Sequence, residues 1–461
     1  MRLMELSKRE IKEALRNGNI TICVVGLGRI GLPTASAFAD AGAQVIGVDI
    51  DTRVVREVNS GKCRFWDEPE LKKVAKKVVK EGRLKASCDF CSSIAKSDMV
   101  IICVPTTVND SRAPHCPAIF DSCKKVAKSL KKGSLVVVES TVGPGTVERL
   151  IAPLIEKHSG MKVIRDFGIA SCPERANPGE ILSNLKLFPR VVGGMDPKST
   201  EVAAAIYQCA LGVKVIRMID PKTANAVKLT ENIFRDVNIA LMNEFAILYE
   251  KLGIDIIEVI HACSTKWNFV PHYPGAGVGG PCLPANAYYI IDEGLKVGYI
   301  PHLIRMAREI NDRMPDHVVT LVTHALNNVG KVVSRSKVAL LGVSYKPNVH
   351  DLRMTPLRRV CYRLGMMGAS IAIYDPMFKG EKVFGLKASK TLEEAVDKAD
   401  CIIIGTAHKE FRNLDLRRIS EICNNPAALV DTRNVVIPTK AKELGFSYLG
   451  VGRRVSRFGD K

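Results

Sequence analysis

One cysteine stands in a loop that is rich in glycine and proline, G-V-G-G-P-C-L-P from Gly277 to Pro284. Glycine allows a backbone to approach a ligand closely and to adopt dihedral angles that other residues avoid. A thiol placed there, near the expected start of a helix, can be a nucleophile toward a carbonyl carbon. Many cysteines are buried structural residues, but the flanking prolines and the aromatic pair Tyr288 and Tyr289 favour a reactive Cys282.

A second set of residues suits hydride transfer. Gly26-Leu-Gly28-Arg-Ile-Gly31 directly follows the apolar run Thr21–Val25, and the next expected strand ends in Asp49. In this context the first glycine makes a tight turn, the second admits a pyrophosphate, and the third lets helix and strand pack closely. A carboxylate at the second strand accepts bonds from ribose hydroxyls and repels a 2′-phosphate, which predicts NAD. The candidate cofactor residues are Gly26, Gly28, Arg29, Ile30, Gly31, Asp49 and Arg53, the last of which could instead be a solvated helix residue.

A long helix carries a third group of polar side chains. Lys228, Asn232 and Arg235 follow one another at i, i+4 and i+7 and share one helix face. This face could simply be hydrated, but an ammonium and an amide there could also stabilise negative charge on a substrate oxygen. A thiol combined with a dinucleotide site suggests an enzyme that oxidises an alcohol past the aldehyde to the acid.

The elements that must position these residues alternate between apolar strands and helices, which is typical of a parallel sheet covered on both faces. We expect a helix over Ala224–Lys251, ended by Gly253, and a fresh start of the alternation near Lys337. The later strands match the earlier ones in order: Thr21–Gly26 with Val338–Gly342, Val45–Asp49 with Ile371–Asp375, Ser97–Cys103 with Ala399–Ile404, and Val136–Thr141 with Leu429–Thr432. Further strands are expected at Lys162–Ile164 and Arg190–Val192, and a helix at Pro33–Ala41.

These patterns predict an α/β chain with two doubly wound, Rossmann-like domains joined by a long central helix and a small helical domain. The predicted segments are 1–220, a dinucleotide-binding domain; 221–330, a central helical domain; and 331–461, a second Rossmann-like domain. The second domain lacks G-x-G-x-x-G, so we expect it to hold something other than a dinucleotide in the usual pose.

Charge and cysteine usage narrow the function classes. The net charge is +19, but the basic residues recur in short clusters such as Lys72 to Lys77, which favour solvated helix faces over a nucleic-acid interface. Ser7 and Glu10 have capping-box spacing in a charged N-terminal segment, which is unlike a signal peptide. No apolar run approaches the roughly 20 residues of a membrane span. The 14 cysteines lack metal-site spacing beyond Cys88 and Cys91, which we expect to be unlinked thiols, and they favour the cytoplasm.

These residues together resemble the UDP-glucose/GDP-mannose dehydrogenase family of nucleotide-sugar 6-dehydrogenases, from Thr21 to about Arg433. Members have an N-terminal NAD domain, a central helix and a C-terminal domain for the UDP part, and they usually form dimers. The resemblance therefore implies NAD, a UDP-sugar and a homodimer, with no nucleic acid, membrane or metal partner. The motifs are Gly26–Gly31 with Asp49, Val104–Thr106, Glu139–Thr141, Cys172–Gly179, Lys228–Asn232, the Cys282 loop and Gly342–Arg353.

The resemblance implies a four-electron oxidation of the sugar C6 alcohol through a thiohemiacetal and then a thioester on Cys282. It assigns oxyanion stabilisation to Lys228 and Asn232, and thioester hydrolysis to Glu174 with Thr141. The implied catalytic residues are Cys282, Lys228, Asn232, Glu174, Thr141 and Asn286. Thr106, Thr141 and Arg353 join the cofactor residues. The implied substrate residues are Glu174, Arg175, Lys228, Asn232, Lys266, Gly279, Gly280, Tyr345 and Lys346.

One position departs from the family pattern. The family usually has an aspartate four residues after the cysteine, where this chain has Asn286, which cannot act as a carboxylate base. The stretch from Lys228 to Glu244 looks most like the UDP-N-acetyl-D-mannosamine branch, with UDP-N-acetylglucosamine or UDP-glucose as alternatives. A two-electron hydroxy-acid dehydrogenase and a catalytically silent NAD-binding sensor also remain open at this point.

Overall fold

The computed structural model describes residues 2–109 and 111–454 and divides into two compact units. The N-terminal unit comprises the residues up to Glu231 together with Tyr288–Tyr299. The C-terminal unit comprises Asn232–Ala287 and the residues from Ile300 onward. Two of the three boundaries fall inside helices, α10 (Pro221–Leu252) and α12 (Leu283–Lys296), and the third follows α12.

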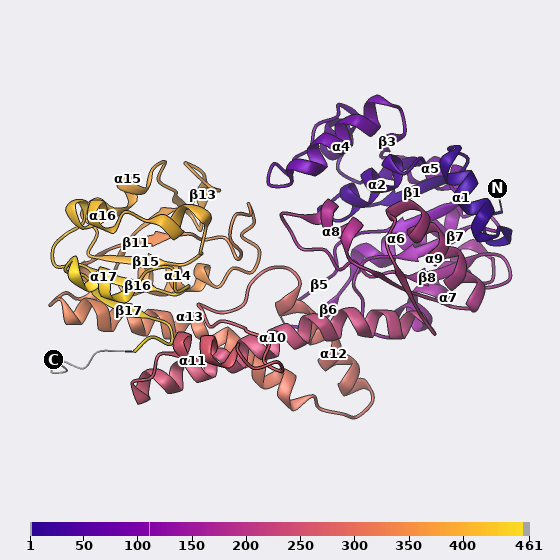
Figure 1. Ribbon diagram of the computed structural model, residues 1–461. Coiled ribbons are helices and arrows are strands. Elements are labelled where there is room, and N and C mark those ends of the chain that lie inside the picture. Colours follow the sequence, from indigo (N-terminus) through magenta and orange to yellow (C-terminus); the bar gives the residue numbers. More distant parts are fainter. Residues whose placement is uncertain (1, 110, 455–461) are drawn as a thin grey trace. The chain divides into compact units, whose positions relative to one another are not determined.

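The N-terminal unit is built on a sheet with the order β10-β9-β8-β7-β4-β1-β2-β3 (Figure 1). The pairs from β3 to β8 are parallel, in the doubly wound order that places ligands at the carboxyl ends of the strands. The strands are β1 (Thr21–Val25), β2 (Gln44–Val48), β3 (Leu84–Ser87), β4 (Met99–Ile102), β7 (Leu135–Val138), β8 (Gly168–Ser171), β9 (Arg190–Gly194) and β10 (Val215–Met218).

Helices cover this sheet in two groups. One group packs into the main core of the unit together with α2, and the other packs around α6. The first group is α1 (Lys8–Arg16), α2 (Gly31–Asp40), α4 (Pro69–Lys80), α8 (Ile181–Leu187) and α9 (Pro197–Leu211), and the second is α5 (Phe90–Lys96), α6 (Pro117–Ser129) and α7 (Ala152–Ser159).

Local sequence signals in this unit act as expected. The Ser7 side chain accepts a bond from the Glu10 amide while the Glu10 carboxylate accepts one from the Ser7 amide, so the predicted capping box is present. The lysines from Lys72 to Lys77 lie exposed on α4, whose Leu71 and Val78 are buried. This helix face is therefore solvated, as the clustering predicted.

Two expectations for this sheet are wrong. The strand expected at Lys162–Ile164 is absent; Val163 makes only an isolated bridge to Phe167, and the strand is β8, which begins at Gly168. Ile164 has a positive φ of 72°, which is incompatible with a strand. The sheet is also not parallel throughout, because β9 pairs with β8 antiparallel and β10 follows β9.

The C-terminal unit contains a parallel sheet with the order β12-β11-β15-β16-β17. Successive residues along its strands face two different hydrophobic cores: Val338 and Leu340 of β11 belong to one cluster, and Ala339 and Leu341 belong to the other. The strands are β11 (Lys337–Leu341), β12 (Ser370–Tyr374), β15 (Cys401–Ile404), β16 (Ala428–Asp431) and β17 (Ser447–Gly450). Its helices are α13 (His302–Asn328) and α14 (Leu357–Met366) toward the first cluster, and α15 (Leu392–Val396), α16 (Leu416–Ile422) and α17 (Pro438–Glu443) toward the second.

The expected echo between the two halves is present in the topology. The order β2-β1-β4-β7 of the first sheet corresponds to β12-β11-β15-β16 of the second. In both, the acid that ends the second strand accepts a bond from the turn after the first: Asp49 from the Leu27 amide and Asp375 from the Val343 amide. The fold is therefore the predicted pair of doubly wound sheets.

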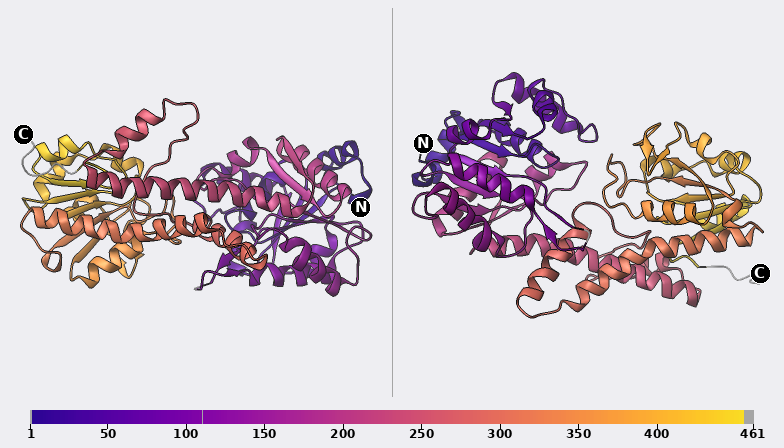
Figure 2. Two further views of the ribbon diagram at one scale, coloured as in Figure 1. Left: turned by 90° about the horizontal axis from the view of Figure 1, so that it is seen from below. Right: turned by 180° about the vertical axis from the view of Figure 1, so that it is seen from behind.

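Helix α10 is continuous over 32 residues (Figures 1 and 2) and ends before Gly253, which has the expected left-handed conformation (φ 70°). Among the described residues, no helix combines the length and the apolar composition of a membrane span. The remaining elements are α3 (Thr52–Asn59), α11 (Ile256–Cys263), the two-residue strand pairs β5 (Thr107–Val108) with β6 (Pro114–His115) and β13 (Lys382–Val383) with β14 (Leu386–Lys387), and short helical turns at Leu3–Glu5, Val147–Ile151, Val333–Arg335 and Lys409–Asn413.

Asp375 organises the turn after β11 from a fully buried position. Its Oδ2 accepts bonds from the amides of Val343 and Ser344 and from Nε2 of His408, at 2.7, 3.1 and 3.1 Å. The His408 ring donates through Nε2 because its Nδ1 accepts the Asn348 amide. Burial alone would raise the pKa of Asp375, but the hydrogen bond from His408 and the backbone donors hold this pKa below its usual value.

We expect Asp375→Asn to destabilise the C-terminal unit by about 2 kcal/mol, or about 5 °C in Tm, at pH 7, because buried donors lose a charged acceptor. Since the folded-state pKa is depressed, the stabilisation is present above the unfolded pKa and is lost as the pH falls through the folded one. Thermal unfolding from pH 7 to pH 3 should therefore show the difference between variant and wild type shrinking with acid. An equal difference at every pH would contradict this account.

Candidate active site

The glycine loop after β1 has the geometry that a dinucleotide requires. Gly26 has a φ of 90°, and a Cβ there would meet the Cys103 carbonyl oxygen at 2.9 Å. A Cβ on Gly31 would overlap the Gly26 carbonyl, so Gly31 provides the close contact between helix and strand. A Cβ on Gly28 would meet nothing within 4 Å, which leaves that face of the loop open for a ligand. Gly26 and Gly31 thus have the turn and the close packing that their spacing predicted, and the open face at Gly28 leaves room for the predicted pyrophosphate.

Asp49 is fixed where it can meet a ribose. Its Oδ2 accepts the Leu27 amide of the glycine loop and its Oδ1 accepts the Asp51 amide, both at 2.9 Å. Each oxygen retains a lone pair for a ribose hydroxyl. Together with the open face at Gly28 and the start of α2 at Gly31, this arrangement fits NAD.

Arg29 and Arg53, two predicted cofactor residues, have protein partners. Arg29 donates to Asp67 at 2.8 Å, and its guanidinium lies over the Phe65 ring. Arg29 therefore ties the glycine loop to the segment before α4. Arg53 pairs with Asp51 through two bonds of 3.1 and 2.9 Å and is largely exposed.

Glu174 is buried, and both of its carboxylate oxygens accept hydrogen bonds. Its Oε1 accepts Nη1 of Arg190 at 2.9 Å, and its Oε2 accepts the Ala176 amide at 2.6 Å. The adjacent Arg175 does not face the same way: it donates to Glu231 of α10 and, at 2.6 Å, to the Pro189 carbonyl. The loop from Cys172 to Gly179 is thereby clamped at two successive residues.

Lys228 lies on α10 one turn before the C-terminal unit begins. It is buried to 8% exposure, and within the described ranges its ammonium has no hydrogen bond or ion pair. A buried charge without a protein partner is costly, so an ammonium kept in this position is suited to an anionic ligand or transition state.

Cys282 stands immediately before α12, as expected for a thiol at a helix start, and it is exposed and outside any disulfide. The partial positive charge at a helix N-terminus favours a thiolate. The glycines before it lie against the loop after β11: a Cβ on Gly280 would meet the Tyr345 ring at 2.7 Å, and one on Gly279 would meet the Met354 carbonyl oxygen at 2.7 Å. Both glycines are required at least for this packing.

Asn286 lies in the first turn of α12, and its side chain is bonded to Asn232 of α10. Its Oδ1 accepts Nδ2 of Asn232 at 2.5 Å, and its amide donates to the Cys282 carbonyl at 2.9 Å. Asn286 is buried, with 4% exposure. The residue that replaces the usual aspartate therefore orients the Asn232 amide beside the cysteine turn.

Arg353 brings a positive charge close to the thiol. Its side chain donates to Asp351 from Nε, at 3.0 and 3.1 Å to the two carboxylate oxygens, and from Nη2 at 2.7 Å. Its carbonyl accepts the Gly280 amide at 3.1 Å. Burial opposes the charge of Arg353, but Asp351, Tyr345 and Cys282 raise its pKa above the usual value. The bond from the Gly280 amide ties the segment of Arg353 to the loop that carries Cys282.

The remaining predicted residues lie in loops. Thr106 follows β4 and Thr141 follows β7, at the carboxyl ends of adjacent strands, and both are half-buried. Lys346 is half-buried in the loop after β11, and Lys266 is exposed after α11.

The sequence did not predict that Arg235 and Arg433 lie near one another. A Cβ on Gly275 would lie 2.7 Å from Nη1 of Arg433, so this guanidinium packs on the segment that leads to Cys282. Desolvation of the guanidinium lowers the pKa of Arg433; the negative charge of Asp431 opposes this shift, and the positive charge of Arg235 adds to it. Neither guanidinium forms an ion pair within residues 2–109 and 111–454. Arg235 was visible on the Lys228 face, but no sequence signal linked it to Arg433 almost two hundred positions away.

A polar network supports the cysteine loop from beneath. Asn243 of α10 accepts the Gly275 amide at 2.9 Å and donates to Asn311 of α13 at 2.8 Å. Asn311 in turn donates to Asp236, which also accepts Arg308 at 2.7 Å. All of these side chains are buried, so the loop rests on a rigid base.

Comparison with known proteins shows similarity to one family along most of the chain. Family models match residues 20–211, described as the UDP-glucose/GDP-mannose dehydrogenase family NAD binding domain, 222–313, its central domain, and 339–438, its UDP binding domain. A relative from Pyrococcus horikoshii, named UDP-N-acetyl-D-mannosamine dehydrogenase, is 35% identical over 94% of this chain and 99% of its own length.

Solved structures agree with this match. The structure titled as the UDP-D-ManNAc dehydrogenase from Pyrococcus horikoshii has a TM-score of 0.88 at 34% identity and covers 94% of this chain and 99% of that one. The structure of an NDP-N-acetyl-D-galactosaminuronic acid dehydrogenase from Methanosarcina mazei Go1 has a TM-score of 0.81 at 32% identity and covers 98% of both chains.

Proposed function

The chain belongs to the UDP-glucose/GDP-mannose dehydrogenase family, and we propose from this premise that it oxidises the C6 alcohol of a UDP-N-acetylhexosamine to the uronate. The observation that carries the proposal is the exposed Cys282 at the start of α12, in a loop whose Gly280 amide is bonded to the Arg353 carbonyl. UDP-N-acetyl-D-mannosamine is the favoured substrate because relatives of that name match most of the chain. UDP-N-acetylglucosamine and UDP-glucose are the alternatives.

We assign residues 1–220 to NAD binding, 221–330 to the catalytic helices and dimerisation, and 331–461 to the UDP part of the substrate. The open face at Gly28 and the anchored Asp49 support the first assignment. NAD, when bound, accepts a hydride from C6. The loop residues Thr106 and Thr141, at the carboxyl ends of β4 and β7, are candidates for contacts to it.

The thiol divides the reaction into two oxidations and a hydrolysis. The first oxidation of the C6 alcohol gives the aldehyde, and the Cys282 sulfur adds to its carbon. The resulting thiohemiacetal gives its remaining C6 hydride to a second NAD and its hydroxyl proton to solvent, which leaves a thioester. Water then adds to the thioester carbonyl, the C–S bond breaks, and the carboxylate leaves as the thiolate is restored. Covalent attachment keeps the aldehyde from escaping between the two oxidations.

The side chains that the family resemblance assigns to catalysis suit the charges that arise. A tetrahedral intermediate places negative charge on the former carbonyl oxygen, which donors of fixed orientation stabilise. We propose Lys228 and Asn232 for this task, and Asn286 as the residue that orients Asn232 rather than as a base. Glu174 is proposed to accept the proton of the hydrolytic water, which makes a carboxylate at position 286 dispensable.

The arginine pair suits the anionic part of the substrate. Neither guanidinium forms an ion pair within the described ranges, and a diphosphate offers both of them bidentate anionic acceptors. We propose that Arg235 and Arg433 contact the UDP diphosphate, with Lys346 and Tyr345 nearby in the same unit. Lys266 and Arg175 are weaker substrate candidates, because Lys266 is exposed and Arg175 is bound to Glu231.

Two other functions are less well supported. A two-electron hydroxy-acid dehydrogenase would need neither a thiol at a helix start nor a second Rossmann-like unit. A silent cofactor-binding protein was suggested only by Asn286, and the bond from Asn232 gives that residue a role compatible with catalysis.

A homodimer in the cytoplasm is proposed as the working form. Exposed apolar residues recur on α10 at Phe234, Leu241, Leu248 and Leu252, and Trp267 is 92% exposed. Exposed apolar stripes of this kind mark protein interfaces, and a second copy of the chain would cover them. Unpaired thiols fit a reducing compartment. Light scattering on the purified protein tests the dimer.

The substrate is tested with a panel of UDP-sugars in the presence of NAD. We expect kcat/KM for UDP-N-acetyl-D-mannosamine to exceed that for UDP-glucose by roughly a hundredfold or more, because a site that binds the acetamido group leaves polar groups unpaired without it. Product stereochemistry identifies the uronate. A preference for UDP-glucose would overturn the proposed substrate, and no turnover with any UDP-sugar would overturn the activity.

A further inference from the structure

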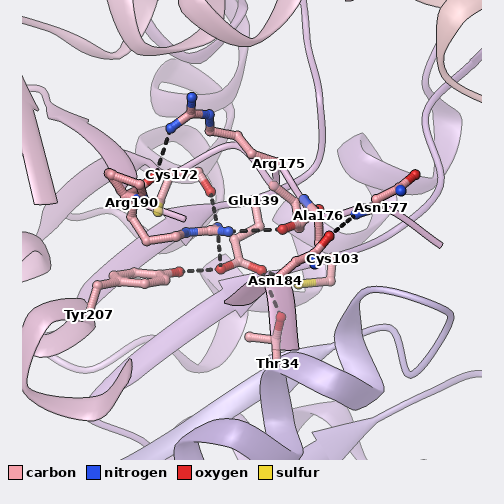
Figure 3. Close-up of polar contacts among 12 residues, drawn as sticks. Thr34, Cys103, Glu139, Cys172, Arg175, Ala176, Asn177, Asn184, Arg190 and Tyr207 are labelled. Atoms are coloured by element: carbon pink, nitrogen blue, oxygen red, sulfur yellow. Dashed lines mark hydrogen bonds and ion pairs between the residues drawn. The ribbon is translucent and has the colours of Figure 1, made fainter. Parts of the chain in front are cut away.

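Glu174 is held by a buried charged cluster that the proposed reaction does not use directly. The centre of the cluster is Arg190 on β9, which is 2% exposed (Figure 3). Its Nη1 donates to Glu174 at 2.9 Å, and its Nη2 donates to Glu139 at 3.3 Å and to the Cys172 carbonyl at 3.2 Å. One planar guanidinium therefore bridges two carboxylates and the backbone that precedes Glu174.

Each carboxylate oxygen of Glu139 accepts two hydrogen bonds. Its Oε1 accepts Tyr207 at 2.6 Å in addition to Arg190, and its Oε2 accepts Thr34 at 3.1 Å and Cys103 at 3.2 Å. The carboxylate is 1% exposed, and burial raises its pKa while Arg190 and Tyr207 act in the opposite direction. With both oxygens occupied and no solvent access, Glu139 can hold a partner but cannot exchange protons with a substrate.

The position of the cluster argues against a purely structural role. A buried ion pair seldom stabilises a fold more than apolar residues of the same size would. This one lies just beyond the carboxyl end of β7, in the region where doubly wound sheets bind their ligands. Thr34 also ties it to the first turn of α2, the helix that follows the glycine loop.

We propose that Glu139 and Arg190 are positioning residues that hold the Glu174 carboxylate in one orientation for the hydrolysis of the thioester. Arg190 fixes Oε1 of Glu174 and the Ala176 amide fixes Oε2, so the carboxylate cannot rotate. Glu139 in turn fixes the guanidinium, which otherwise would be free to follow Glu174. This inference rests on the proposed function, since it assumes that hydrolysis follows two oxidations.

The test separates the oxidation steps from the release of the acid. Arg190→Lys keeps the charge but cannot span both carboxylates with a planar fork. In a single turnover with NAD and UDP-N-acetyl-D-mannosamine, we expect the first NADH within about threefold of wild type and acid release slowed by roughly tenfold or more. Intact-mass measurement should then show a sugar adduct on Cys282.

Two further variants keep the test decisive. Glu139→Gln is nearly isosteric and should slow acid release in the same selective way, even if Arg190→Lys does not fold. Thr200→Val is the matched control: Thr200 on α9 is buried and accepts the Gly194 amide at 2.9 Å, so its loss removes a buried bond of the same unit without touching the cluster. The control should leave both phases unchanged.

The outcomes distinguish this inference from the proposed function. If the wild type forms an adduct and the two cluster variants slow both phases equally or neither, the positioning role is refuted while the function stands. If the wild type forms no adduct and releases one NADH per sugar, the proposed function fails and the inference fails with it. Selective loss of hydrolysis in either cluster variant supports the inference.

Discussion

Replacing Cys282 by serine is expected to abolish uronate formation, with a loss of roughly a thousandfold or more. A serine hydroxyl at the start of α12 is a far weaker nucleophile than a thiolate and gives a poor route to the acyl intermediate. NAD affinity should remain nearly unchanged, because the glycine loop and Asp49 lie in the other compact unit. NADH formation, acid yield and NAD binding by calorimetry measure the three effects.

Cys263 provides the matched control for this substitution. It lies at the end of α11 in the same unit, is half-buried and is outside any disulfide. Cys263→Ser should retain activity within about twofold. Normal acid production by Cys282→Ser would refute the covalent route.

Glu174→Gln should produce the second large effect, a roughly hundredfold slower release of acid with a covalent sugar adduct that persists on the protein. The amide cannot accept a proton from water, and its NH₂ group would face either Arg190 or the Ala176 amide, both of which are donors. Rapid quenching followed by intact-mass measurement detects the adduct.

Glu180 is the control for Glu174. It is exposed six residues along the same segment, and its side chain does not cap α8. Glu180→Gln should show neither the adduct nor the slow phase. If Glu174→Gln turned over without an adduct, another group would have to activate the water.

Most of the fold could be predicted from the sequence because its signals are local. Unbroken apolar runs such as Thr21–Val25 and Val338–Leu341 form central strands buried on both faces, and Gly253 ends α10 where a left-handed residue is needed. The strand β8 could not be placed from composition, since Gly-Ile-Ala-Ser has little strand character and depends on pairing with β7.

For the candidate site too, local patterns could be predicted from the sequence and contacts between distant residues could not. The three glycines carry a local pattern, so the turn at Gly26 and the close packing at Gly31 could be predicted from their spacing. The Asn232–Asn286 bond and the proximity of Arg235 to Arg433 involve residues distant in sequence, and no local sequence pattern predicts such contacts. The bond from Arg175, a residue that the resemblance places in the substrate site, to Glu231 of α10 likewise joins residues distant in sequence.

The most direct measurement of the central claim is the number of NADH molecules formed per UDP-sugar consumed, with the product identified by mass. The thiol mechanism predicts two NADH and a uronate, with no free aldehyde detectable by a carbonyl trap. One NADH per sugar, with an aldehyde or ketone as the product, would contradict it.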